Sequence, residues 1–116
     1  MIPHLLKAGV NVLFFDYRGF GKSTGWPSEA GLYADADAIW SYVQSREPDI
    51  SPRQVIIVGI SMGTGPAAYL AKEMNAGTLV LFSPYVSLRD VASDRPIIGL
   101  FAPLLRYNLP TAEFVS

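Results

Sequence analysis

Short apolar runs alternate with amphipathic stretches along the first two thirds of the chain. Each run is nearly continuous in apolar residues, and the runs lie at Val10–Phe15, Gln54–Ile60 and Thr78–Phe82. Continuous rather than alternating apolarity is typical of parallel strands covered on both faces, so the pattern predicts three such strands. Ser28–Arg46 has apolar residues at helical spacing and Met62–Met74 is rich in small ones, which predicts two helices. Met1–Ala8 predicts the end of a further helix.

The ends of these elements carry the expected signals. Ser28 is suited to cap the helix after it, and Gly9 is suited to stop the first one. The order helix, strand, helix, strand, helix, strand is typical of an α/β fold with a parallel sheet. Ser83–Ser116 breaks this order, since it contains several prolines and an apolar stretch without a clear period. We expect a loop with a short helix there.

Composition narrows the class of protein. The chain has 116 residues, of which 50% are hydrophobic and 16% charged, against about 25% charged in an average soluble domain. This length allows one domain at most, and the low charge fits the inner part of a larger core. Nine basic residues against ten acidic ones give a net charge of -1, so nothing predicts a nucleic-acid partner.

Residue counts also exclude several kinds of site. The chain has no cysteine and a single histidine, His4, which excludes a thiolate zinc site, a cysteine nucleophile and a two-histidine metal site. Nothing in the sequence implies a metal or an organic cofactor. Met1–Val10 does not have the pattern of a signal peptide, and the apolar stretch Pro96–Leu105 is shorter than the about 20 residues of a membrane span. The pattern assigns no compartment.

The strongest chemical signal is the pentapeptide Gly59-Ile60-Ser61-Met62-Gly63, placed between a predicted strand and a predicted helix. This context is what a nucleophile elbow requires, because the serine must stand on a tight turn at the end of a strand. Gly59 and Gly63 would let the strand and helix backbones approach each other closely. The backbone N–H of Met62, at the start of the helix, would face a developing oxyanion.

A second glycine-rich segment, Asp16–Ser23, comes after the first predicted strand and ends in a Gly-Lys-Ser triplet. A phosphate-binding P-loop would need a glycine at Asp16, and a dinucleotide-binding motif would need a glycine or alanine at Thr24. Both are absent. We therefore expect a turn folded over the strand end near the rim of the active site, with Asp16 and Arg18 bonded to local polar groups.

These motifs resemble the α/β-hydrolase superfamily, most of all the serine aminopeptidase, monoacylglycerol lipase and related abhydrolase-domain group. The similar segments read VNVLFFDYRGFGKSTG, VIIVGISMGTGPAAYLA and TLVLFSPYVSL. The resemblance implies a partial α/β-hydrolase fold, incomplete at both ends, that forms one partial domain over residues 1–116. Residues 1–83 would form its strand-helix core and residues 84–116 a loop segment leading into a cap. The chain would then be an internal fragment of a larger hydrolase.

The resemblance assigns Ser61 as the nucleophile and the Met62 N–H as half of the oxyanion hole, with Gly59 and Gly63 as the elbow glycines. In the family the acid and then the histidine come after the serine, but no histidine lies beyond Ser61 here. We interpret His4 as an ordinary surface or boundary residue. Loop acids are expected at Asp90 and Asp94, and solvated helix residues at Glu29, Asp35 and Asp37. Pro96–Tyr107 fits a lid or acyl-pocket wall, or equally core packing.

The predicted function is a serine hydrolase that cleaves ester, amide or thioester bonds through an acyl-enzyme, with a lipid ester or peptide-like acyl compound as substrate. The isolated chain would lack the histidine and acid of the triad. Two alternatives stay open: a non-catalytic relative used for binding, and an inactive truncated fragment. The family's sheet order also predicts that Val55–Val58 pairs with Thr78–Phe82, while Val12–Phe15 does not pair with Val55–Val58.

Overall fold

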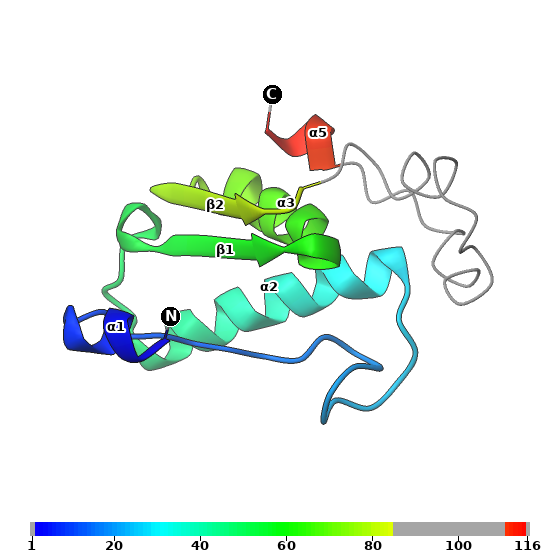
Figure 1. Cartoon of the computed structure of the whole chain (residues 1–116), viewed down its shortest axis with the longest axis horizontal. Helices are drawn as coiled ribbons and strands as arrows, with labels where there is room; N and C mark the ends of the chain where they lie inside the picture. The colour runs from blue at the N-terminus through cyan, green and yellow to red at the C-terminus, as the bar shows by residue number, and fades with distance from the viewer. Residues whose placement is uncertain (1, 85–110, 116) are drawn as a thin grey trace.

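The computed structural model describes residues 2–84 and 111–115. Helix α1 covers Ile2–Lys7, and helix α2 covers Glu29–Arg46. Strand β1 (Ile56–Ile60), helix α3 (Thr64–Met74) and strand β2 (Thr78–Phe82) come next, and short 3-10 turns at Pro52–Gln54 and Ser61–Gly63 flank β1. Helix α5 covers Thr111–Phe114 (Figure 1).

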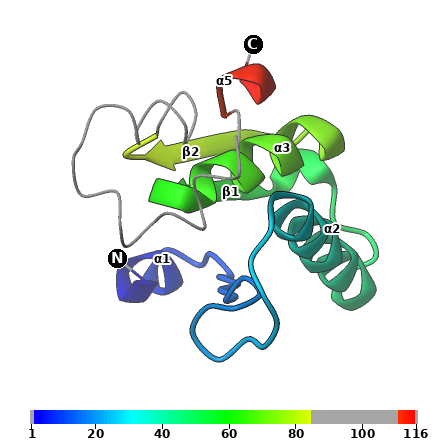
Figure 2. The same cartoon turned by 90° about the vertical axis from the view of Figure 1, so that its right-hand side faces the viewer.

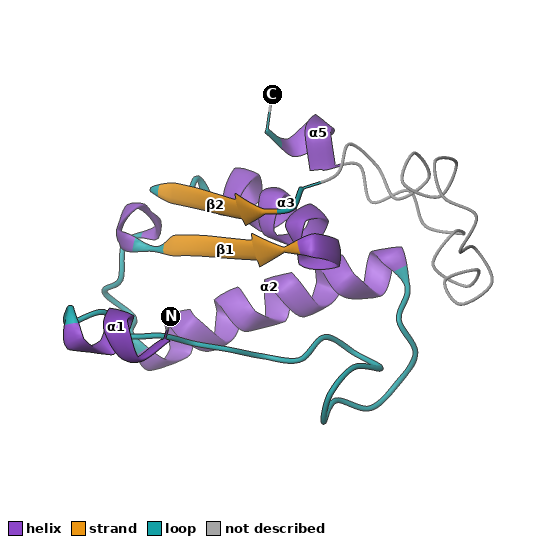
Figure 3. Ribbon diagram, viewed as in Figure 1, coloured by secondary structure: helices purple, strands orange, loops and turns teal. Residues whose placement is uncertain are grey.

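Strands β1 and β2 form a parallel pair with Ile56 opposite Thr78 and Ile60 opposite Phe82. The helix between them, α3, contacts both strands and also α2, and Figures 2 and 3 show it along one side of the pair. This strand-helix-strand unit confirms the predicted α/β arrangement and the predicted pairing of the second and third apolar runs.

Identifiable signals mark the start of α2 and the end of α3. The Ser28 hydroxyl accepts a hydrogen bond from the backbone N–H of Gly31 at 3.0 Å, which caps α2 as predicted. Helix α3 begins at Thr64, two residues later than expected, because the chain first makes a 3-10 turn. Pro66 therefore lies in the first turn of α3, where its missing N–H removes no helical bond. Asn75 ends α3 with a left-handed φ of 52°.

The predicted strand at Val10–Phe15 is wrong for the described residues. Figure 1 shows the segment as an extended loop that belongs to no sheet. Among residues 2–84 and 111–115 the only sheet is the β1–β2 pair. A β-strand forms only where its backbone hydrogen-bonds to a neighbouring strand about 4.8 Å away. An apolar sequence does not by itself provide such a neighbour. Leu13 and Phe14 are accordingly exposed.

The expectation that β1 is covered on both faces is also wrong for the described residues. Gly59 faces α3 and is buried, whereas Ile56, Val58 and Ile60 on the opposite face are each about half exposed. The best-buried part of the fold lies between α2 and α3, where Leu32, Ala36, Ala67 and Ala68 are at most 5% exposed. The rigid packing next to Ser61 is therefore on the helix side of the sheet.

Aromatic rings join the last helix to the others. The ring centroids of Tyr33 on α2 and Tyr69 on α3 are 4.7 Å apart, and Phe114 on α5 lies 5.8 Å and 5.6 Å from them. Lys72 adds a hydrogen bond from its ammonium to the Glu113 carbonyl at 3.1 Å. None of the helices in the part of the chain that the structure describes is long and apolar enough to cross a membrane.

Candidate active site

Ser61 stands at the point where β1 ends and the turn into α3 begins. It is exposed, and its backbone has a φ of +50°, which is the left-handed region. A side chain in this region crowds the next carbonyl and costs roughly 1–2 kcal/mol, so a serine adopts it only where surrounding contacts impose it.

Thr64 holds the turn after Ser61. Its hydroxyl donates to the Ser61 carbonyl at 2.7 Å, and its backbone N–H donates to the same oxygen. Because Thr64 is completely buried, this carbonyl is fixed from the interior of the fold. Met62 is the middle residue of the turn and is half-buried.

Gly59 marks the closest approach of strand and helix. A Cβ added at Gly59 would lie 2.7 Å from the Ala67 Cβ, and 2.9 Å from both the Gly63 carbonyl oxygen and the Thr64 Cα. Real Cβ atoms essentially never come so close, and two of these three neighbours are backbone atoms that cannot rotate away. Only glycine fits between β1 and the start of α3 at this position.

The backbone of Gly63 lies at the close approach to Gly59, but the position that a Gly63 side chain would occupy is not crowded. Gly63 has an ordinary φ of −69°, and a Cβ built there would meet Tyr17 Cε2 at 3.8 Å, a normal van der Waals separation. A small side chain would therefore fit at position 63 without displacing Tyr17, which belongs to the glycine-rich segment.

The glycine-rich segment satisfies its own polar groups, as predicted. The Asp16 carboxylate accepts a hydrogen bond from the Lys22 backbone N–H at 3.0 Å, and the Ser23 hydroxyl donates to the Asp16 carbonyl at 2.7 Å. Gly21 has a left-handed φ of 53° and lies directly against the Asp16 carboxylate. The Asp16 carboxylate therefore closes this turn from within the segment.

Asp35 is paired with Arg18, so its interpretation as a solvated helix residue is wrong. Arg18 donates to Asp35 from Nη2 at 2.7 Å, from Nε at 3.0 Å and from its backbone N–H at 2.9 Å. Hydrogen bonding from Arg18 lowers the pKa of Asp35, and hydrogen bonding to Asp35 raises the pKa of Arg18. Nothing in the sequence pattern indicates this pair, because its members lie 17 residues apart.

Asp37, also expected to be solvated, accepts a hydrogen bond from the Tyr69 hydroxyl at 3.2 Å. Burial first, and then the bond to Asp37, raises the pKa of Tyr69. Glu29 lies in the first turn of α2, as expected, and accepts from the Tyr33 hydroxyl at 3.4 Å. The Tyr69–Asp37 bond links α3 to α2, and the Tyr33–Glu29 bond lies within α2. Neither bond involves Ser61.

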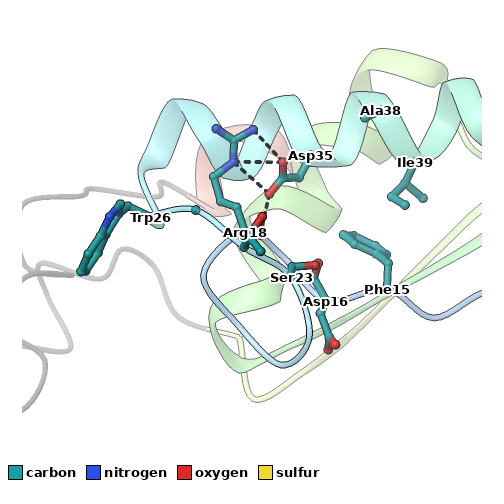
Figure 4. Close-up of a pocket in the computed structure, with 10 residues that line it drawn as sticks. Phe15, Asp16, Arg18, Ser23, Trp26, Asp35, Ala38 and Ile39 are labelled. Atoms are coloured by element: carbon teal, nitrogen blue, oxygen red, sulfur yellow. Dashed lines mark hydrogen bonds and ion pairs between the residues drawn. The ribbon is translucent and has the colours of Figure 1, made fainter.

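A groove of about 520 Å³ lies between the glycine-rich segment and α2. Figure 4 shows Arg18 reaching across to Asp35 along it, with Phe15 and Ile39 farther along and Trp26 turned away from the others. Ser61 does not line this groove. The groove and the turn at Ser61 are therefore separate features, joined through the segment that carries Tyr17 and Arg18.

Several sequence expectations lie outside the described residues: Asp90, Asp94 and the segment Pro96–Tyr107. His4 lies in α1 and is exposed, as expected of a surface residue. Residues 2–84 and 111–115 contain no group of three or more side chains suited to hold a metal ion.

Residues 1–115 match a family model described as "Serine aminopeptidase, S33". The chain is 44% identical over 86 residues to alpha/beta hydrolase domain-containing protein 17B of Xenopus laevis, covering 74% of this chain and 30% of the relative. It is 42% identical over 86 residues to protein 17C of Homo sapiens, covering 74% and 26%. An uncharacterised protein of Mycobacterium tuberculosis is 42% identical over 85 residues, covering 73% and 30%. No solved structure gives a significant match.

The chain spans less than a third of the length of these curated relatives. The matched family is the one that the sequence resembles, and the parallel strands with flanking helices are consistent with a partial fold of that kind.

Proposed function

The chain belongs to the serine aminopeptidase family of the α/β hydrolases, and from this premise we propose that the protein hydrolyses acyl compounds through Ser61. Family membership supports a hydrolase with a small-molecule substrate. The observation that carries the choice of Ser61 is its left-handed backbone, φ +50°, at a strand-to-helix turn. Such strain in a non-glycine residue is concentrated at functional sites.

In the proposed reaction the Ser61 Oγ attacks the carbonyl carbon of an ester, amide or thioester, while a base takes the hydroxyl proton. The tetrahedral oxyanion accepts a hydrogen bond from the backbone N–H of Met62. As the intermediate collapses, the leaving group departs with that proton and an acyl-Ser61 ester remains. Water then attacks this ester, restores the serine hydroxyl and releases the acid.

The base and its orienting acid would come from parts of the whole protein other than the described residues. No histidine lies beyond Ser61 in the chain, and His4 lies on exposed helix α1. An unassisted serine hydroxyl is a weak nucleophile, so the 116-residue chain by itself is expected to be inactive. The alternative function, a non-catalytic binding protein of this fold, applies if the whole protein supplies no such base.

Labelling of the whole protein with a fluorophosphonate probe tests the proposal, because such probes react with activated serines. We expect strong labelling that Ser61→Ala abolishes. Ser83→Ala is the matched control, since Ser83 is also exposed, also lies just after a strand and also has a left-handed φ, 52°. Labelling that survives Ser61→Ala would remove Ser61 from the mechanism. A correctly folded protein that is not labelled at all would favour the binding function.

A further inference from the structure

We propose that the buried hydroxyl of Thr64 sets the direction of the Met62 N–H, the proposed oxyanion donor, by holding the carbonyl of Ser61. Thr64 is then a positioning residue, because it acts through the peptide bond between Ser61 and Met62 and touches no reacting atom. This role rests on the acyl-enzyme function proposed for Ser61 and adds to it the group that orients the oxyanion donor.

The Ser61 carbonyl oxygen accepts two hydrogen bonds from Thr64. The Thr64 hydroxyl donates to it at 2.7 Å, and the Thr64 backbone N–H donates to it as well. Two donors occupy both lone pairs of a carbonyl oxygen. If the carbonyl turned away, the hydroxyl of a completely buried residue would lose its partner, which is costly in the interior of a protein.

The Met62 N–H belongs to the same peptide plane as this carbonyl. No peptide bond within residues 2–84 and 111–115 is cis, and in a planar trans peptide the N–H and the C=O point in opposite directions. A carbonyl that points at Thr64 therefore directs the Met62 N–H away from Thr64. Whatever fixes the direction of the carbonyl also fixes the direction of the oxyanion donor.

Thr64 is itself held firmly. It is the first residue of α3, and residues 64–68 of that helix are all buried. Closely packed residues of this kind have little room to move. A threonine in a helix also has few rotamers, one of which bonds its hydroxyl to a carbonyl three or four residues earlier. The hydroxyl therefore connects the buried start of α3 to a peptide bond at the exposed end of β1.

The two bonds to the carbonyl also make the Met62 N–H a better donor. Hydrogen bonds that share one amide polarise it and strengthen each other, most of all where the surroundings exclude water. Thr64 is completely buried, so its bonds are of this kind. A negative charge that develops on the substrate oxygen would meet a donor that is oriented before the reaction begins, which is how an oxyanion hole lowers the barrier.

Two pairs of proteins that differ by this hydroxyl test the role of Thr64 in the whole protein. Wild type and Thr64→Val have nearly the same shape, and Thr64→Ser and Thr64→Ala both lack the buried methyl group. In each pair the member without the hydroxyl should be labelled by a fluorophosphonate about tenfold more slowly, since removal of a whole oxyanion donor costs about a hundredfold or more. For p-nitrophenyl acetate, kcat should fall equally while KM changes little.

A thionoester, in which sulfur replaces the carbonyl oxygen, distinguishes a misdirected oxyanion donor from a general loss of structure. Sulfur is a weak hydrogen-bond acceptor, so the thionoester gains little from the donor. The ratio of the rates on p-nitrophenyl acetate and p-nitrophenyl thionoacetate should fall about tenfold without the hydroxyl, and Thr64→Ser should restore it. If both rates fell equally, Thr64 would support only the fold.

Ser45→Ala is the matched control. The Ser45 hydroxyl also donates to a carbonyl three residues earlier, that of Tyr42 at 2.7 Å, but it lies near the end of α2. This variant should keep the wild-type rates and the wild-type ratio.

Normal rates in a folded Thr64→Val protein would overturn the role of Thr64, and if that variant does not fold, equal rates in Thr64→Ser and Thr64→Ala would do so. An unchanged ratio between the two esters would overturn it as well. If the wild-type protein is not labelled, the role proposed for Ser61 fails and that of Thr64 fails with it. The two failures are therefore distinguishable.

Discussion

Ser61 and Ser83 occupy equivalent positions at the ends of neighbouring strands. Ile60 and Phe82 are partners in the parallel register, and the serine after each has a left-handed φ, 50° for Ser61 and 52° for Ser83. Ser61 leads through a 3-10 turn into α3, whereas the residues beyond 84 lie outside the described part of the chain. The strand-to-helix turn at Ser61 makes it the candidate nucleophile, and Ser83 serves as an internal control.

Gly59→Ala should destabilise the fold far more than Gly63→Ala. The new methyl group at position 59 would collide with backbone atoms of Gly63 and Thr64, and overpacking of this kind costs about 1–3 kcal/mol. At position 63 the new group would meet Tyr17 at a normal distance and at an ordinary φ. Urea unfolding of the two variants measures the difference, and equal losses would contradict the close approach described at Gly59.

Ser61→Gly should be more stable than Ser61→Ala, although neither should be labelled. Glycine relieves roughly 1–2 kcal/mol of left-handed crowding, and its greater freedom in the unfolded chain offsets about 0.5–1 kcal/mol of that gain. The free energy of unfolding should therefore differ by up to about 1.5 kcal/mol in favour of glycine. If alanine were the more stable, Ser61 would not be left-handed in solution.

The stability difference between wild type and Asp35→Asn should depend on pH. Arg18 lowers the pKa of Asp35 in the folded protein below its ordinary value of 3.8. Between the folded and unfolded values the unfolded chain binds more protons, so stability rises with pH in that window. The extra free energy of unfolding of the wild type over Asp35→Asn should be complete above about pH 4 or 5. It should decline as the pH falls through the pKa of Asp35 in the folded protein.

Urea titrations at several pH values between neutral and strongly acidic conditions measure this advantage. Asp16→Asn does not serve as the control, because Asp16 closes the neighbouring turn. Asp49→Asn does, since Asp49 is exposed and lies in the loop after α2. A constant difference between wild type and Asp35→Asn across the acid range would show that Asp35 is not ionised against Arg18.

Phe114→Ala should release α5 from α3 without disturbing the sheet. The ring is half-buried and meets Tyr33 and Tyr69, and aromatic pairs of this geometry contribute about 0.5–1.5 kcal/mol each. Amide exchange in residues 111–115 should become faster, while exchange in β1 and β2 should not change. Val115→Ala is the control, because Val115 is 55% exposed. Equal effects of the two substitutions would contradict the ring packing.

The elements that local patterning specifies were predictable from the sequence. The β-strand at Thr78–Phe82 and the helix after Ser28 lie within one residue of the expected bounds, because apolar spacing and a capping side chain act locally. Val10–Phe15 has the composition of a strand, but whether it forms a ladder depends on a neighbour that its own sequence does not encode.

In the candidate site, too, only the features that depend on nearby residues were predictable from the sequence. The strand-to-helix context of Ser61 depends on residues within ten positions of it, and so does the need for glycine at position 59. The pairing of Arg18 with Asp35 depends on how a loop folds back over a helix that lies 17 residues further along the chain. No spacing rule connects residues that meet in this way.

The left-handed backbone of Ser61 also bears on the order in which the protein folds. An isolated strand and turn have no reason to adopt this conformation, because its cost is offset only after Gly59 has met Ala67 and Thr64 has become buried. The turn should therefore form late, after α3 has docked on β1. During refolding, helical circular dichroism would recover first, and reactivity of the serine would lag behind it by the time that docking takes.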